Sequence, residues 1–159
     1  MICKKAEKVK KSLQEAGWRT VEEIDAKLKL QRMLAELGDA IDQYNMGLSY
    51  DKGMGVSVDK VESVKWFRLA AEQGIAQAQF NLGVAYSTGE GVSVDKVEGI
   101  KWYRLAAEQG DAAAQYNLGL AYFKGDGVDI DKVEGMKLMK FSAKNGFSEA
   151  VKILESLSL

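Results

Sequence analysis

Residues 75–110 read IAQAQFNLGVAYSTGEGVSVDKVEGIKWYRLAAEQG, and their last seven letters, RLAAEQG, also occupy residues 68–74. The two copies of this heptapeptide lie 36 residues apart. Aligning residues 39–74, 75–110 and 111–146 at this spacing shows one unit that occurs three times, the third time more loosely. Repeats of about 20–50 residues usually form solenoids, in which stacked units share one continuous core. The spacing therefore predicts a repeat protein.

Within the second unit, the apolar residues recur at helical spacings of three and four, as from Phe80 to Tyr86. A first helix should end at the turn Gly89–Gly91, because glycine accepts the left-handed conformation that closes a helix. A second helix should begin at Asp95, which with Glu98 has the spacing of a capping box. Asp59/Glu62 and Asp131/Glu134 repeat this cap, and Gly74, Gly110 and Gly146 follow the second helices. We therefore expect an all-α fold, a right-handed α-solenoid of stacked antiparallel helix pairs.

Glycine stands in the middle of each expected first helix, at Gly47, Gly83 and Gly119. At this position glycine costs about 0.8–1 kcal/mol relative to alanine. Close approach of a neighbouring helix would offset this cost. We expect the tyrosine one turn later to fill the space beside the crossing; these tyrosines are Tyr50, Tyr86 and Tyr122.

These features resemble a known family. AQFNLGVAYSTGEGVSVDKVEGIKWYRLAAEQG, residues 78–110, is similar to a Sel1-like repeat, the 36-residue relative of the tetratricopeptide repeat. The resemblance covers residues 39–146 and rests on the NLG..Y core, the G.GV turn and the W[FY]RLAAEQG second helix. The third unit departs from the pattern: Leu138 and Met139 replace the tryptophan–aromatic pair, and KFSAKNG replaces RLAAEQG.

The repeat spacing also suggests how the chain is divided. We expect a degenerate repeat or cap over residues 1–38, three repeats at 39–74, 75–110 and 111–146, and a capping helix over 147–159. Thr20 with Glu23 should open a helix of about 17 residues. Its apolar residues Ile24, Leu28 and Met33 can cover the first full repeat.

Composition limits the partners. With 22 basic and 23 acidic residues, the formal charge of −1 provides no overall field to attract nucleic acid or a membrane surface. The single cysteine, Cys3, and the absence of an apolar run after the basic start favour a cytoplasmic protein without a signal peptide. We expect a monomer or a weak homodimer.

Catalysis is disfavoured by the residues that are present. The sequence contains no histidine, which is the commonest general base and metal ligand. The G-x-G of Gly53 and Gly55 recurs in every unit without a preceding strand, so a helix turn explains it better than a nucleotide loop. Capping accounts for the paired carboxylates. We therefore predict no enzyme activity, no cofactor and no metal site.

A binding surface is the remaining function. In the tetratricopeptide family that the chain resembles, the first helices line a concave groove that holds peptides or helices. Asparagine recurs on this face, and its amide can donate and accept hydrogen bonds along an extended ligand. The alternative, that the asparagines and aromatic residues make contacts within the protein and stabilise the fold, stays open. The predicted contact residues are Ile41, Tyr44, Asn45, Leu48, Asp51, Lys52, Gln77, Phe80, Asn81, Val84, Ser87, Thr88, Ala113, Tyr116, Asn117, Leu120, Phe123 and Lys124.

Specificity should reside in the columns that differ between units, because packing does not dictate them: Ile41/Gln77/Ala113, Asp51/Ser87/Phe123 and Lys52/Thr88/Lys124. Lys65, Arg68, Lys101 and Arg104 are interpreted as a solvated convex face. The leading hypothesis is a non-catalytic protein-binding adaptor. One alternative is a bacterial immunity protein that neutralises a toxin by tighter binding. Another is a designed, consensus-like scaffold, against which the loose third unit argues.

Overall fold

The computed structural model describes residues 20–157, and within this range it consists of eight α-helices and no strand. Residues 1–19, with Cys3 and the first half of the expected N-terminal hairpin, lie outside the described residues. The helices are α2 (Val21–Glu36), α3 (Ala40–Lys52), α4 (Lys60–Glu72), α5 (Ala76–Thr88), α6 (Lys96–Glu108), α7 (Ala112–Lys124), α8 (Lys132–Lys144) and α9 (Ser148–Leu157).

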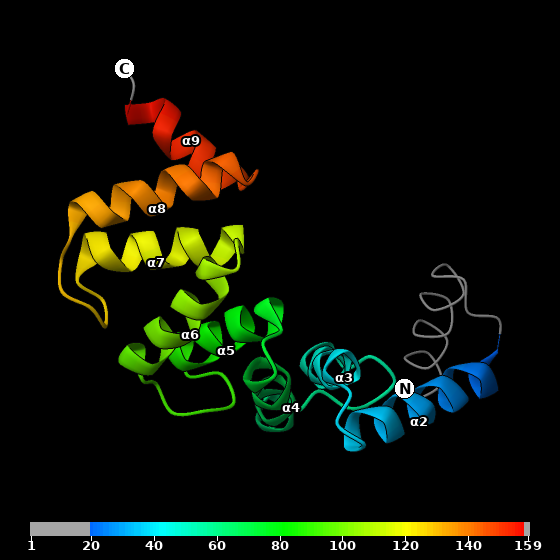
Figure 1. Ribbon diagram of the computed structural model, residues 1–159. Coiled ribbons are helices and arrows are strands. Elements are labelled where there is room, and N and C mark those ends of the chain that lie inside the picture. The colour runs from blue at the N-terminus through cyan, green and yellow to red at the C-terminus, as the bar shows by residue number, and fades with distance from the viewer. Residues whose placement is uncertain (1–19, 158–159) are drawn as a thin grey trace, which may run out of the picture.

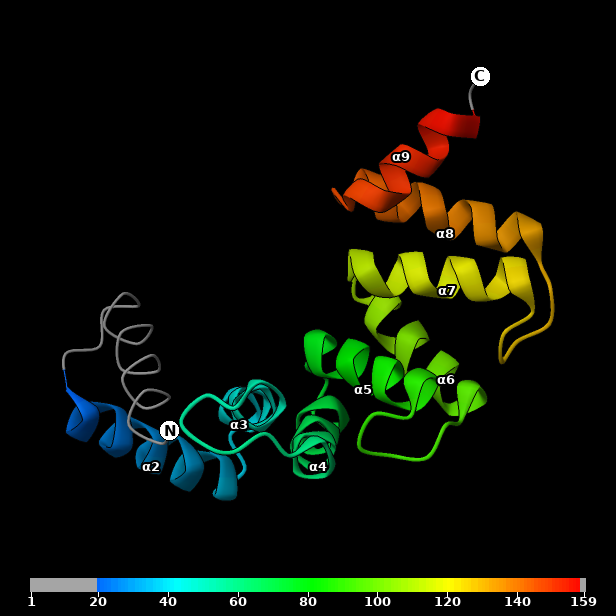
Figure 2. The ribbon, with the colours of Figure 1, turned by 180° about the vertical axis from the view of Figure 1, so that it is seen from behind.

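Each helix packs against the next along the chain, and the closest associations are within the pairs α3/α4, α5/α6 and α7/α8. Figures 1 and 2 show that the helices follow a curved path from α2 at one end to α9 at the other. Buried residues of adjoining pairs form the shared core, for example Ala71, Leu82 and Ala85. The predicted all-α solenoid is confirmed.

Aspartates begin the second helices as predicted. The Glu98 N–H donates to the Asp95 carboxylate over 3.0 Å, and Asp59 and Asp131 cap α4 and α8 in the same way. The reciprocal half of the capping box does not form. The Asp95 N–H donates instead to the Tyr86 carbonyl, and the Glu98 carboxylate accepts from Lys101. The aspartate therefore ties the second helix to the first as well as capping it.

The first helices close at glycines in the left-handed conformation, with φ of 71° at Gly53, 82° at Gly89 and 73° at Gly125. The mid-helix glycine is a packing residue, because a Cβ at Gly83 would lie 2.6 Å from the Tyr103 ring. The ring that lies against Gly83 belongs to Tyr103 of the second helix, while Tyr86 packs against the buried cluster that contains Leu82.

Tyr86 also joins successive repeats. Its hydroxyl accepts from the Arg68 guanidinium of the preceding repeat over 2.5 Å, and the guanidinium also lies over the ring. The pairs Arg32–Tyr50 and Arg104–Tyr122 repeat this arrangement. Reading Arg68 and Arg104 as merely solvated was therefore wrong, since both side chains bridge two repeats.

A second set of bonds between repeats is buried or partly buried. The Gln79 side chain donates to the Ala71 carbonyl over 3.1 Å and accepts from the Gln109 amide over 2.8 Å. Gln43 and Gln115 make the same two bonds, with Gln73 and Asn145 as their donors. The recurrence of glutamine in this column is thus a structural requirement.

At the N-terminal end, Thr20 caps α2 by accepting from the Glu23 N–H, and α2 has 16 residues, close to the expected length. Ile24 and Leu28 are half-buried, as expected for residues that cover the next repeat. Met33 is 50% exposed, so its expected covering role was wrong. Met33 is the counterpart of Leu69 in the next repeat, and the Leu69 side chain is similarly exposed.

Candidate functional site

Half of the predicted contact residues line three related grooves, one at each junction between successive units. Each groove is bordered by a second helix, by the first helix that follows it and by the turn after that first helix. The cavities are about 190, 180 and 220 Å³ along the chain. Each is lined by the asparagine of the first helix and the aliphatic residue three positions later: Asn45 and Leu48, Asn81 and Val84, Asn117 and Leu120. We call the side of α3, α5 and α7 that carries these residues the first-helix face.

The second groove is crossed by an ion bridge. The Lys60 ammonium lies 2.6 Å from Asp51 in its own repeat and 3.2 Å from Glu90 in the next. The hydrogen bond to Asp51 raises the pKa of Lys60, and the bond to Glu90 raises it further. In the third groove, Lys96 makes the corresponding contact with Asp126, over 2.7 Å.

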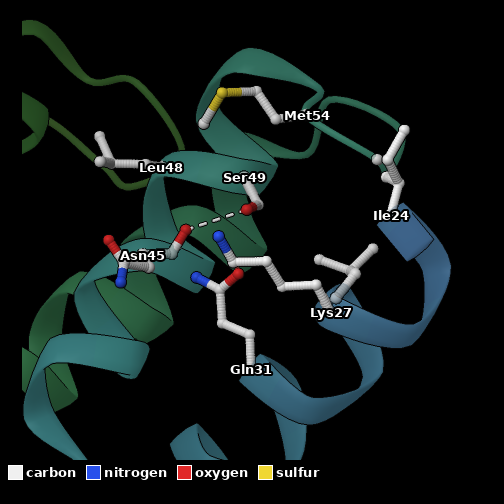
Figure 3. A pocket seen from close by; sticks show the side chains of 9 residues that line it. Ile24, Lys27, Gln31, Asn45, Leu48, Ser49 and Met54 are labelled. Carbon is white, nitrogen blue, oxygen red and sulfur yellow. Dashed lines mark hydrogen bonds between the residues drawn. The ribbon is translucent and has the colours of Figure 1, made fainter. Parts of the chain in front are cut away.

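The first groove lacks this bridge. Ile24 and Met54 stand where the later grooves have lysine and an acidic residue, so the rim is apolar. Figure 3 shows the side chains of Lys27 and Gln31 reaching from α2 toward Asn45 and Ser49. The first groove therefore combines an apolar rim with a polar floor.

The asparagine amides contact the fold as well as the grooves. Burial raises the pKa of Tyr44 from its ordinary value of 10.0, and hydrogen bonding by Asn81 acts in the opposite direction. Burial likewise raises the pKa of Tyr103, and Ser87 and Asn117 oppose it. Asn81 and Asn117 thus support tyrosines of the preceding repeat, while their side chains also border the grooves.

The aromatic residues of the predicted set pack in the core. The centroids of the Tyr44 and Phe67 rings lie 5.9 Å apart, and those of Phe80 and Tyr103 lie 6.0 Å apart. Tyr116 extends the series by packing on Phe147, with centroids 4.9 Å apart. These half-buried rings position the first helices and leave little surface for a ligand.

One variable column was misread as free of packing. Asp51, Ser87 and Phe123 each contact the second helix of their own repeat. Asp51 pairs with Lys60, whereas a Cβ at Gly99 would lie 2.7 Å from the Ser87 hydroxyl. Phe123 lies against Gly135 in the same way, where a Cβ would come within 3.3 Å of its ring. The side chains of this column therefore contact the second helix of their own repeat and are not free surface.

The other two variable columns are more open. Ile41 is 64% exposed, Gln77 is exposed and Ala113 is half-buried. Lys52, Thr88 and Lys124 are exposed at the ends of their helices. Residues in these columns can contact a ligand without disturbing the packing.

Sequence reasoning missed the residues that distinguish the grooves. They form two columns, Ile24/Lys60/Lys96 at the start of the second helices and Met54/Glu90/Asp126 in the turns. Their pairing was visible in the repeat alignment, because an apolar pair in one unit becomes an ion pair in the next two.

No group of three or more metal-binding side chains occurs among residues 20–157. Within the same range, none of the helices combines the length and apolarity needed to cross a bilayer. The groove residues contain no nucleophile paired with a base.

Comparison with known proteins identifies the family of the repeats. The model of the Sel1 repeat matches residues 40–75, 76–111 and 112–147, one residue later than the units defined above. A search of curated proteins finds no match. Sel1-repeat proteins generally mediate protein–protein interactions, and their fold is typically a non-catalytic scaffold.

Several solved structures are similar to this chain, among them the following three. A Sel1 repeat protein from Oxalobacter formigenes is 39% identical over 71% of this chain and 45% of its own, with a TM-score of 0.69. A protective antigen of uropathogenic Escherichia coli with an SLR fold is 36% identical over 93% of this chain and 35% of its own, with a TM-score of 0.82. This chain thus spans less than half the length of either protein. The cysteine-rich protein B of Helicobacter pylori shares the fold, at 20% identity over 84% of this chain and 97% of its own, with a TM-score of 0.65.

Proposed function

Because the chain belongs to the Sel1-repeat family, we propose that it is a non-catalytic module that binds a segment of a partner protein along its first-helix face. The segment would run over α3, α5 and α7 and enter the three junction grooves. The repetition of one groove at three junctions is the observation that carries this proposal. A ligand that engages all three gains from several weak contacts held on one rigid scaffold.

The grooves support different contributions to binding. The apolar rim of the first groove, with Ile24 and Met54, suits an apolar side chain of the partner. Burial of such a side chain contributes roughly 1.5–3 kcal/mol. In the second groove, Lys60 is 40% exposed in its ion pairs, and such pairs are weak enough to exchange for a polar group of the ligand. The first groove would therefore contribute most of the binding energy, and the later grooves would select partner segments with polar side chains.

The affinity separates the roles that fit this binding mode. An adaptor that holds a peptide segment would bind in the micromolar range, whereas an immunity protein would bind its toxin in the nanomolar range or tighter. A designed scaffold would have no native partner and an unusually high melting temperature. We favour the adaptor, because the three grooves are small and separate.

The test begins with affinity capture from the native cell extract, followed by titration of the purified partner. The groove variant carries Asn45→Ala, Asn81→Ala and Asn117→Ala, and circular dichroism first establishes that it is folded. We expect its affinity for the partner to fall at least tenfold. Ile24→Ser in the first groove should cause a similar loss without affecting a buried tyrosine.

A matched control places three substitutions on the second helices: Val61→Ala, Lys65→Ala and Lys101→Ala. These side chains are exposed and lie outside the grooves, so the control should retain the affinity of the native protein. If the control loses the partner while both groove variants keep it, the first-helix face is not the binding surface.

A further inference from the structure

The third repeat differs from the first two on its second helix. In α6, Lys101 pairs with Glu98, Lys96 pairs with Asp126, and the helix ends at Glu108. In α8, lysine replaces that last glutamate, at Lys144. The two lysines of α6 are thus both paired with carboxylates, whereas the lysines of α8 are paired less completely.

Four exposed lysines line one side of α8: Lys132, Lys137, Lys140 and Lys144. Of these four lysines, only Lys137 makes an ion pair with another residue of the range 20–157, namely with Glu134 at 3.2 Å. Apolar side chains lie between the lysines, since Val133 is 82% exposed and Phe141 is 45% exposed. We call this surface the α8 lysine face. It borders an open hollow of about 670 Å³.

A second hollow adjoins this face where the repeat has lost a tryptophan. In the second repeat, Trp102 packs against the buried cluster that contains Ala71 and Leu82, beside Tyr86. The corresponding position in the third repeat is Leu138. A hollow of about 370 Å³ lies here, bordered by Leu138 and by the counterparts of those neighbours: Ala107, Leu118 and Tyr122. We call it the Leu138 hollow.

The two hollows form one continuous surface, because Lys137 and Phe141 border both. Their combined lining contains five basic side chains, the four lysines and Arg104, and two carboxylates, Glu108 and Glu134. The surface therefore carries an excess of positive charge around an apolar recess. Its charge is opposite in sign to the net charge of the whole chain, −1.

We propose that the α8 lysine face and the Leu138 hollow form a second binding surface, which takes an acidic segment of a partner protein anchored by one aromatic side chain. The aromatic ring occupies the place that Trp102 occupies one repeat earlier. Acidic residues on neighbouring turns of the segment pair with Lys140, Lys144 and Lys132. Aromatic anchors in desolvated pockets are the usual centres of binding energy at protein interfaces.

The shape of the surface favours a protein segment over a lipid bilayer. The Leu138 hollow lies between α6, α7 and α8, and it accepts an inserted side chain rather than a flat layer of headgroups. The hollow is also within the range of about 300–1,000 Å³ that is typical of ligand pockets. This surface is distinct from the first-helix face, so its failure would leave the proposed function standing.

The probe is a capped helical peptide with one central tryptophan and glutamates on the turns before and after it, titrated by calorimetry. We expect a dissociation constant in the micromolar range that weakens as salt is added. Replacing the tryptophan of the peptide by alanine, or its glutamates by lysines, should reduce the affinity at least tenfold.

Two variants of the protein test the two halves of the surface. Leu138→Trp restores the residue of the first two repeats, so it should fill the hollow, raise the melting temperature and reduce peptide affinity at least tenfold. Lys140→Glu with Lys144→Glu changes only exposed side chains and should cause a similar loss. The matched control, Lys65→Glu with Lys101→Glu, makes the same change of net charge on α4 and α6 and should leave the affinity within twofold of the native value.

The proposal is overturned if the tryptophan peptide does not bind at millimolar concentration, or if Leu138→Trp binds it as well as the native protein does. It is also overturned if phosphatidylglycerol vesicles bind through the lysines with no effect of Leu138→Trp, which would make the face a membrane contact. Loss of binding in Leu138→Trp and in the double lysine variant, with retention in the control, establishes the site.

Discussion

The junction between α2 and α3 and the junction between α4 and α5 use the same bonds between units but contain different grooves. Gln43 and Gln79 donate to the equivalent backbone carbonyls over 3.1 Å at the two junctions. The groove of the first has the apolar rim of Ile24 and Met54, whereas Lys60 crosses the second. The buried polar bonds thus hold the stack together, and the groove residues are free to change.

The largest expected difference between the two junctions lies in their turns. Gly55 and Gly91 have φ of 75° and 74°, but a Cβ at Gly91 would overlap the Lys60 carbonyl of the neighbouring helix. A Cβ at Gly55 would meet only the Leu28 side chain, at 3.1 Å. Gly55→Ala should cost about 1–2 kcal/mol for its left-handed conformation alone. Gly91→Ala should cost about 3 kcal/mol or more, because backbone cannot move aside as a side chain can.

Urea denaturation of the two alanine variants measures this difference in the free energy of unfolding. Both substitutions place alanine in the same left-handed backbone conformation, so each serves as the control for the other. Equal losses of stability would mean that the two turns pack equally closely. The predicted difference between the surroundings of Gly55 and Gly91 would then be wrong.

Substitution of the glutamines should cost the same free energy of unfolding at both junctions. Gln79→Leu removes one buried and one partly buried hydrogen bond, while the Ala71 carbonyl keeps the bond that it accepts from the Gly74 N–H. The expected cost is about 1–3 kcal/mol. Gln43→Leu should cost the same within the error of a thermal or chemical melt, since the geometry at the two junctions is the same. A loss confined to Gln79→Leu would show that α2 is not held as a true repeat.

Much of the fold could be predicted from the sequence, because its signals are local. Gly89 ends one helix and Asp95 begins the next whatever lies around them, and both occur at fixed places in the repeat. The contacts between repeats were harder to predict. Tyr86 pairs with Arg68, a residue of the previous unit, and nothing within one helix indicates that partner.

The candidate site was predicted only in part for the same reason. The asparagines and the aliphatic residues that follow them were selected from their place in the first helix, and they line the grooves. Lys60 and Glu90 were overlooked because they come from a helix start and a turn in different units. Asp51 and Ser87 were interpreted as variable surface, although each contacts the second helix of its own repeat.

Tyr103 lies at the next junction, between α6 and α7, in the position that Phe67 has one repeat earlier. Burial raises its pKa above 10.0, so its neutral form stabilises the fold fully below pH 10 and less as the pH rises through the higher pKa of the folded state. Tyr103→Phe should cost about 1 kcal/mol at neutral pH through its lost hydrogen bonds.

The pH dependence separates this effect from simple loss of packing. The melting temperature of the native protein should fall as the pH is raised above 10, and that of Tyr103→Phe should fall less, because one buried phenol no longer ionises. Phe67→Tyr is the reciprocal control. An identical decline in the native protein and in Tyr103→Phe would mean that Tyr103 ionises as freely as it does in an unfolded chain.

The smallest effect is expected from exchanging the contents of the grooves themselves. Lys60→Ile with Glu90→Met gives the second groove the rim of the first, at the cost of leaving Asp51 without its ion pair. Partly exposed ion pairs contribute about 0–1 kcal/mol, so the free energy of unfolding should change by no more than about 1 kcal/mol. The salt dependence of stability should weaken in the same variant, because one bridge between repeats no longer responds to screening. A loss larger than that of Gln79→Leu would show that the bridge holds the stack together. The groove residues would then be part of the scaffold and not its variable surface.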